Sequence, residues 1–123
     1  MGSNFRSRVL YLLNTEERSA PEAVQQAAEV RCIRRGSEPD LSIKQFDPAV
    51  VVIGAPLDHD AHIAIDRVST LMLPVLGFGT GPNERLMADV STTIAMSDLR
   101  SMISLLASPA YMGSLPPGQG ANG

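Results

Sequence analysis

The chain has 123 residues and a net charge of −3, and its acidic and basic residues are interspersed. This length suits a single domain that buries a core without disulfide or metal cross-links, and the charge balance lacks the basic stripe of a nucleic-acid-binding protein. One cysteine, few aromatic side chains and no apolar run of membrane-spanning length argue against a disulfide scaffold, a base-stacking platform and a membrane partner, and predict a cytoplasmic location.

The first half of the chain is predicted to alternate strands and helices. The continuous apolar run at 9–13 indicates a strand that is covered on both faces. Residues 19–22 (S-A-P-E) combine the capping serine, early proline and acidic first turn that open a helix. Residues 29–35 form a second strand whose alternating arginines suggest a sheet edge, and Cys32 within it is expected to be a buried thiol. A short helix is expected over 40–46.

The second half continues this alternation. Residues 50–53 form the most apolar strand, and Asp58 or Asp60 can cap the helix that follows it. The remaining elements are predicted as a strand at 74–78, a helix over 84–89, a strand at 92–95 and a final helix that Ser97 caps.

Five strands that alternate with helices predict an α/β fold. The expected architecture is a flavodoxin-like parallel sheet of strand order 2-1-3-4-5 with helices on both faces. This domain should span 8–107, after a disordered N-terminus at 1–7. Residues 108–123 are rich in proline and glycine, which is typical of a flexible linker or tail. Ligands of such sheets bind at the carboxyl ends of the strands.

Four segments of this layout resemble a response-regulator receiver domain. They are V-L-Y-L-L-N at 9–14, P-A-V-V-V-I-G-A-P at 48–56, P-V-L-G-F-G-T at 74–80 and A-M-S-D-L-R-S-M-I-S-L-L at 95–106. The resemblance covers about residues 8–107. It implies a phosphate-accepting crevice in which an acidic pair after the first strand holds magnesium and an aspartate ends the third strand. A hydroxyl side chain after the fourth strand and a lysine after the fifth complete that crevice.

The residues that perform this chemistry are missing from the sequence. The positions concerned are Leu13 and Asn14 for the acidic pair, Gly54 for the acceptor, Gly79 for the hydroxyl with Thr80 one residue late, and Ala95 or Met96 for the lysine. The single lysine of the chain, Lys44, is not near the fifth strand, and phosphoryl transfer depends on positioned metal and cationic charge. The resemblance therefore implies a degenerate pseudo-receiver of a bacterial signalling protein, with no phosphorylation, catalysis, metal or cofactor.

The glycine-rich loop G-F-G-T-G-P-N-E-R supports an alternative. Thr80, Gly81, Asn83 and Arg85 would hold the phosphate of a nucleotide second messenger, which would make the domain a small-ligand sensor. Because the spacing matches neither the Walker nor the dinucleotide-binding pattern, a turn with Asn83 as a helix cap is the simpler interpretation. The scarcity of aromatic residues disfavours a flavin carrier. The D-H-D-A-H segment at 58–62 is interpreted as a solvated helix start rather than a zinc site.

The last helix and the segment before it suggest a protein-binding face. Methionine side chains adapt to different partners, and the receiver resemblance implies that this side carries the contact with an output domain or with a second copy of the chain. Core packing is the competing interpretation for each methionine, and the stripe Leu99, Ile103 and Leu106 is also the expected core contact of the helix. The candidate interaction face comprises Met87, Met96, Leu99, Arg100, Met102 and Ile103.

Overall fold

The computed structural model describes residues 7–108. The terminal segments expected to be disordered or flexible, 1–7 and 108–123, therefore lie outside the described residues except for Ser7 and Ser108. The described part contains a five-stranded sheet of order β2-β1-β3-β4-β5, in which all neighbouring strands are parallel. The predicted fold class and strand order are confirmed. The strands are β1 (Arg8–Leu13), β2 (Glu29–Arg34), β3 (Val50–Gly54), β4 (Val75–Phe78) and β5 (Ala88–Val90).

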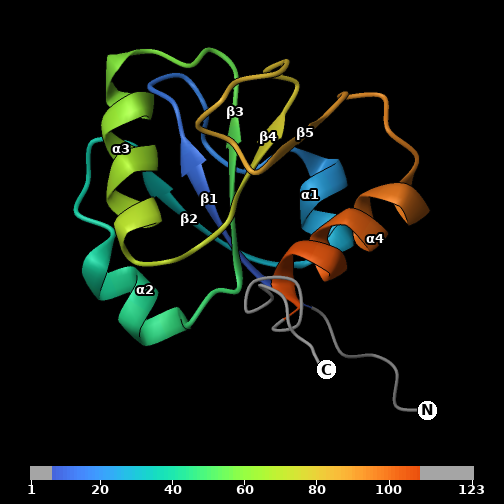
Figure 1. Cartoon of the computed structure of the whole chain (residues 1–123), viewed down its shortest axis with the longest axis horizontal. Helices are drawn as coiled ribbons and strands as arrows, with labels where there is room; N and C mark the ends of the chain where they lie inside the picture. Colours follow the sequence, from blue (N-terminus) through green and yellow to red (C-terminus); the bar gives the residue numbers. More distant parts are fainter. Residues whose placement is uncertain (1–6, 109–123) are drawn as a thin grey trace, which may run out of the picture.

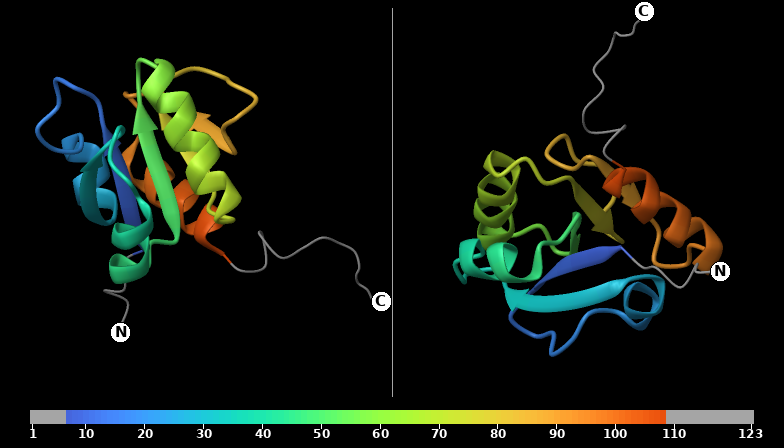
Figure 2. Two further views of the ribbon diagram at one scale, coloured as in Figure 1. Left: turned by 90° about the vertical axis from the view of Figure 1, so that its left-hand side faces the viewer. Right: turned by 90° about the horizontal axis from the view of Figure 1, so that it is seen from below.

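In the described part of the chain, four helices cover the two faces of the sheet. They are α1 (Glu22–Ala27), α2 (Asp40–Phe46), α3 (His59–Thr70) and α4 (Met96–Ala107). α1 and α4 lie on one face and α2 and α3 on the other (Figure 1), and the view from below shows the same two layers (Figure 2). Within the described residues, none of these helices is both long and apolar enough to cross a bilayer.

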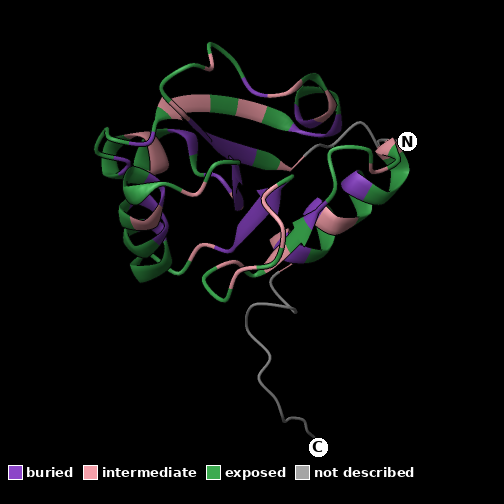
Figure 3. Ribbon diagram, turned by 90° about the horizontal axis from the view of Figure 1, so that it is seen from above, coloured by how far each residue is buried: buried purple, intermediate pink, exposed green. Residues whose placement is uncertain are grey.

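The core consists of two apolar layers that are separated by the sheet. Alternate residues of β1 and β3 point to opposite faces, so Val9 and Val52 pack with α1 and α4, whereas Leu10 and Ile53 pack with α3. Both central strands are buried on both faces, which accounts for their continuous apolar sequences. In Figure 3 the buried residues, coloured purple, lie along the central strands and on the sides of the helices that face the sheet. β2 lies at the sheet edge as predicted, and Cys32 is half-buried rather than fully buried.

The segment between β4 and α4 differs from the prediction. Residues 84–89 do not form a helix, because the backbone from 87 to 90 pairs with β4: the Met87 amide donates to the Val75 carbonyl at 2.9 Å, and Ala88–Val90 are β5. Residues 92–95 do not form a strand. The Ser91 hydroxyl accepts from the Thr93 amide at 3.1 Å, and the Ser91 carbonyl accepts from the Ile94 amide. These local hydrogen bonds compete with strand pairing.

Two helix starts also differ from the prediction. The N-cap of α1 is Pro21, without a side-chain hydrogen bond, so Ser19 does not cap it. α4 begins at Met96 with Ala95 in the extended N-cap conformation, so Ser97 lies inside the first turn. The cap of α3 is confirmed, because the Asp58 carboxylate accepts from the Ala61 amide at 2.8 Å. At the start of α4, by contrast, the Ala95 side chain has no hydrogen-bond acceptor, so packing rather than a side-chain cap stabilises this helix.

Candidate functional site

The candidate site is the crevice at the carboxyl ends of β1 and β3. Leu13 ends β1, Gly54 ends β3, and the Asn14 side-chain amide donates to the Ala55 carbonyl at 3.4 Å between them. Gly54 lies opposite Phe78, the last residue of β4, so Gly79 and Thr80 follow on the neighbouring strand. Most of the predicted crevice positions therefore lie together, at the point where the strand order reverses.

Ala95 and Met96 do not belong to this group. They were expected at the end of the fifth strand, but β5 ends at Val90 and Ser91 follows it, whereas Ala95 and Met96 form the start of α4. The assignment of the lysine position to Ala95 or Met96 is wrong, because β5 lies earlier in the sequence than the pattern suggested. The residue that follows β5 is still not a lysine.

The side chain of Tyr11, which lies beneath position 54, explains why this position is a glycine. A Cβ atom at position 54 would lie 2.6 Å from the Tyr11 hydroxyl oxygen, and its next neighbours would lie at 3.7 Å or more. Tyr11 is fully buried in the middle of β1, and its hydroxyl donates to the Glu17 carboxylate at 2.8 Å. The phenol thus occupies the space that any side chain at the end of β3 would need, including the carboxylate of an acceptor aspartate.

The loop after β1 is closed by its own side chains. The other Glu17 carboxylate oxygen accepts from the backbone amide of Asn14 at 3.0 Å. The side-chain oxygen of Asn14 in turn accepts from the backbone amides of Glu16 and Glu17, both at 2.8 Å. Burial, and then the hydrogen bond to the Glu17 carboxylate, raise the pKa of the Tyr11 phenol well above its usual value. Both Glu17 oxygens are therefore engaged within this loop.

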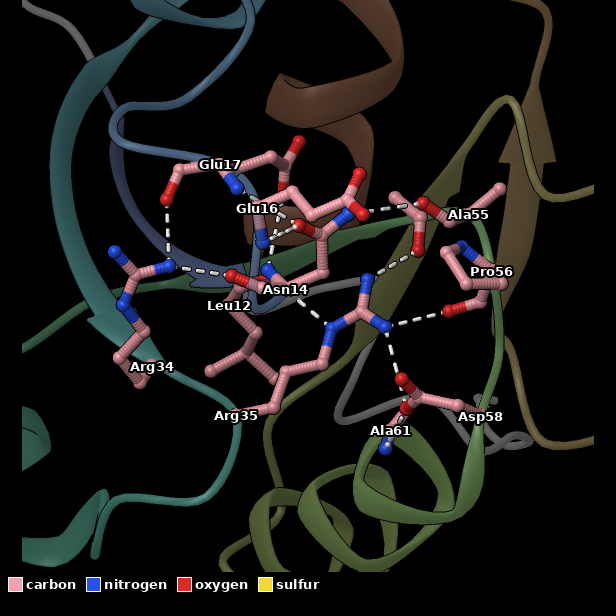
Figure 4. Close-up of polar contacts among 11 residues, drawn as sticks. Leu12, Asn14, Glu16, Glu17, Arg34, Arg35, Ala55, Pro56, Asp58 and Ala61 are labelled. Atoms are coloured by element: carbon pink, nitrogen blue, oxygen red, sulfur yellow. Dashed lines mark hydrogen bonds and ion pairs between the residues drawn. The ribbon is translucent and has the colours of Figure 1, made fainter.

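Arg35 is the residue of the crevice that the sequence analysis missed. It follows β2, is only 5% exposed, and points between the ends of β1 and β3 (Figure 4). The conclusion that the crevice lacks a cation is corrected: it lacks a lysine and contains a guanidinium. The tandem R-R at 34–35 was an available signal. In the predicted strand at 29–35, adjacent residues point to opposite faces, so the two arginines are not expected to extend from the same side.

Four oxygen atoms surround the Arg35 guanidinium. Its Nε donates to the Leu12 carbonyl at 3.5 Å, and its two Nη atoms donate to the Gly54 and Pro56 carbonyls. One Nη also pairs with the Asp58 carboxylate at 3.4 Å. Because these oxygens come from β1, β3 and the cap of α3, one side chain connects the three elements that meet at the crevice.

The space left in the crevice is small. A cavity of about 40 Å³ is lined by residues of the three loops, namely Leu13, Asn14, Thr15, Arg34, Arg35, Gly36, Asp58 and Asp60. A second cavity of about 130 Å³ lies between the Arg35–Glu38 segment and α3. Pockets for organic ligands usually measure about 300–1,000 Å³. These cavities have room for water molecules, but each is smaller than a nucleotide needs.

The glycine-rich loop after β4 uses its polar groups internally. The Thr80 hydroxyl donates to the Gly81 carbonyl at 2.9 Å, and the Asn83 side chain accepts from the Arg85 amide at 2.9 Å. The Arg85 guanidinium pairs with the Asp66 carboxylate on α3. Asn83 therefore caps a turn and not the expected helix.

The D-H-D-A-H segment forms the start of α3. Among residues 7–108, no group of three or more His, Cys, Asp or Glu side chains is arranged to hold a metal ion. Asp58 caps the helix and pairs with Arg35. The segment is thus a capped helix start.

The candidate interaction face is only partly at the surface. Leu99 and Ile103 are 0% and 1% exposed, so their assignment to this face is wrong: they fill the core between α4 and the sheet. Arg100 is exposed but extends toward α1, where it donates to the Gln26 carbonyl at 3.3 Å. Met96 and Met102 are half-buried, and Met87 is 44% exposed. Leu105, which the sequence analysis left out, is 51% exposed.

Comparison with known proteins supports the fold. No family model matches the chain, and no curated protein matches it at a significant level. Among solved structures, the pseudo-receiver domain of the CikA protein is 15% identical with a TM-score of 0.58, over 85% of this chain and 99% of that one. A CheY-like protein (tadZ) from Pseudomonas aeruginosa PAO1 is 16% identical with a TM-score of 0.56, over 92% of this chain and 98% of that one. The chain thus has the CheY-like, flavodoxin-type fold of a receiver domain.

Proposed function

We propose that this domain is a pseudo-receiver that works without phosphorylation, in the cytoplasm of a bacterium. It regulates an output domain by binding it, or by binding a second copy of itself, and it catalyses no reaction. The proposal joins two findings: the fold is that of receiver-like domains, and the strand ends carry neither an acceptor carboxylate at Gly54 nor an acidic pair at Leu13 and Asn14.

One observation carries this proposal. At the end of β3, a Cβ atom on Gly54 would lie 2.6 Å from the Tyr11 hydroxyl, and on the other side the Gly54 carbonyl accepts from Arg35. Phosphoryl transfer needs an acceptor, a bound metal and neutralising charge in fixed positions. Here the acceptor position has no carboxylate, and the guanidinium that lies beside it donates to three carbonyls and pairs with the Asp58 carboxylate.

The test is incubation with acetyl phosphate and magnesium, followed by intact-mass measurement. We expect no phosphoryl adduct, whereas a phosphorylatable receiver domain treated in parallel gains one. Asp58 is the nearest carboxylate after β3, and its side chain is 45% exposed. The Asp58→Asn variant is therefore the matched control: an adduct on the wild type that is absent from this variant would identify Asp58 as an acceptor and contradict the proposal.

The contact surface is proposed to include the flank of α4 that faces away from α1. Leu99, Ile103 and Leu106 face the core, and Arg100 marks the side of α1. At 100° per residue, Met102 and Leu105 lie on the opposite flank. A half-buried methionine and a leucine that is half exposed form an adaptable apolar surface there.

Light scattering tests self-association through this flank. If the domain dimerises, Leu105→Lys should weaken the dimer at least about tenfold, since each 1.4 kcal/mol of lost contact changes Kd tenfold. Leu41→Lys is the matched control, because Leu41 is 63% exposed and lies on α2, on the other face of the sheet. Equal effects of the two substitutions would place the contact elsewhere.

The small-ligand sensor is the alternative proposal, and a thermal-shift screen with nucleotides tests it. The geometry favours it less, because Thr80, Asn83 and Arg85 are engaged with protein groups and the crevice cavities are small. Stabilisation by a nucleotide that disappears in Arg85→Ala would promote this alternative over the pseudo-receiver.

A further inference from the structure

Arg35 is the most deeply buried charged side chain in the described part of the chain. Its side chain is 2% exposed, and no other charged residue among residues 7–108 is buried. A buried charge is stable only where partners replace its hydration. The planar guanidinium has five N–H donors in a fixed fork, and here they face three main-chain carbonyls and one carboxylate.

These partners belong to segments that are far apart in the sequence. Leu12 lies in β1, Gly54 ends β3, Pro56 lies in the turn after β3, and Asp58 caps α3. Arg35 itself follows the edge strand β2. Its hydrogen bonds therefore hold the β3–α3 turn against both β1 and β2, and Figure 4 shows the guanidinium at the centre of this arrangement.

Arg34 has a related but weaker role. Its guanidinium donates to the Asn14 and Glu17 carbonyls, and it fixes the β1–α1 loop. Unlike Arg35, it is exposed and pairs with no carboxylate of residues 7–108. The two consecutive arginines thus hold the two loops that border the crevice, one from the solvent side and one from inside.

We propose that Arg35 is the built-in cation of the crevice. It occupies a guanidinium-binding site formed by the Leu12, Gly54 and Pro56 carbonyls and the Asp58 carboxylate, and it thereby fixes the crevice in one conformation that does not depend on an exchangeable ion. This inference deepens the proposed function, on which its biological meaning rests, because a domain with a tethered cation presents the same surface to its partner at all times.

Chemical rescue tests the guanidinium site. Arg35→Ala should lower Tm by more than about 10 °C, because it leaves a carboxylate and buried carbonyls without their partner. Methylguanidinium at about 20 mM, where its denaturing action is negligible, should raise the Tm of this variant by several degrees relative to the same concentration of sodium chloride. Arg34→Ala is the matched control and should show no such recovery, since its acceptors are open to water. Absence of recovery in Arg35→Ala, or equal recovery in both variants, would overturn the proposal.

A measurement on the wild type decides the question if Arg35→Ala does not fold. In NMR spectra the Arg35 Nε–H should exchange with solvent at least about tenfold more slowly than the Arg34 Nε–H, because exchange requires local opening of the crevice. Magnesium should leave the resonances of residues 54–60 unshifted. Equal exchange of the two arginines, or a saturable magnesium shift, would overturn the proposal. A phosphoryl adduct would instead contradict the proposed function, so the two failures are distinguishable.

Discussion

Substitution of Gly54 by alanine tests the explanation of why β3 ends in glycine. The backbone of Gly54 does not have a positive φ, so any penalty comes from space alone. The new methyl carbon would lie 2.6 Å from the Tyr11 hydroxyl oxygen, which is closer than a van der Waals contact allows. Either the strands separate slightly, or the phenol moves and its hydrogen bond to the Glu17 carboxylate is stretched.

The expected loss of stability follows from the energies of these two responses, the overpacking and the stretched hydrogen bond. Overpacking of a buried position costs about 1–3 kcal/mol, and loss of a hydrogen bond to a charged group costs about 1.5–3 kcal/mol. Since the structure relieves one penalty by accepting the other, the cost should lie near the smaller of the two, and we expect Gly54→Ala to lower the free energy of unfolding by about 1.5–3 kcal/mol. For a domain of this size, that corresponds to a decrease in Tm of roughly 6–15 °C.

Urea unfolding with a double-mutant cycle measures the cause directly. Tyr11→Phe removes the hydroxyl oxygen, and the nearest remaining atoms, the Phe78 carbonyl oxygen at 3.7 Å and Cζ of residue 11 at 3.8 Å, are ordinary contacts. In that background Gly54→Ala should cost less than about 0.5 kcal/mol, which gives a coupling of at least about 1 kcal/mol. Gly36→Ala is the control, because no atom lies within 4 Å of its added carbon.

Additive effects of the two substitutions would refute this explanation. Gly54 would then be required for a reason other than the phenol. The steric argument against an acceptor side chain at the end of β3 would fall with it.

Three further predictions concern stability. Burial and the Glu17 hydrogen bond raise the pKa of Tyr11, so the folded state holds the phenol proton more tightly than the unfolded chain. The stability from this group is complete below the ordinary phenol pKa of about 10 and decreases as the pH rises above it. Urea midpoints between about pH 8 and 11 should therefore decline more in the wild type than in Tyr11→Phe, and parallel declines would contradict this. Ala95→Ser should stabilise the domain by about 1 kcal/mol, because Ala95 has N-cap geometry without an acceptor; a destabilised variant in thermal melts would show that the hydroxyl does not reach the first-turn amides. Gly79 and Gly81 both have φ of 77°, but only at Gly79 would a Cβ collide, at 2.5 Å from the Thr92 methyl carbon. Gly79→Ala should thus cost roughly 1–3 kcal/mol more than Gly81→Ala, and equal urea midpoints would show that Thr92 moves aside freely.

The layered α/β fold was accessible from the sequence because its signals are local and repeated. Continuous apolar runs at 9–13 and 50–53 required burial on both faces, and the arginines of 29–35 indicated the edge. The region after β4 was predicted less well. There, β5 is only three residues long and is defined by its pairing with β4 rather than by its own pattern, so the helix at 84–89 and the strand at 92–95 were misplaced.

The crevice, too, was predicted only in part from the sequence. The sequence by itself determined which groups are missing from the strand ends: a carboxylate at Gly54, an acidic pair at Leu13 and Asn14, and any lysine beyond Lys44. Only the tertiary structure decided what fills the space instead. Tyr11 lies under Gly54, and Arg35 crosses from β2 to the β3–α3 turn. Both contacts join residues that are distant in sequence, and whether a long polar side chain turns inward depends on the oxygen atoms that the assembled sheet brings around it.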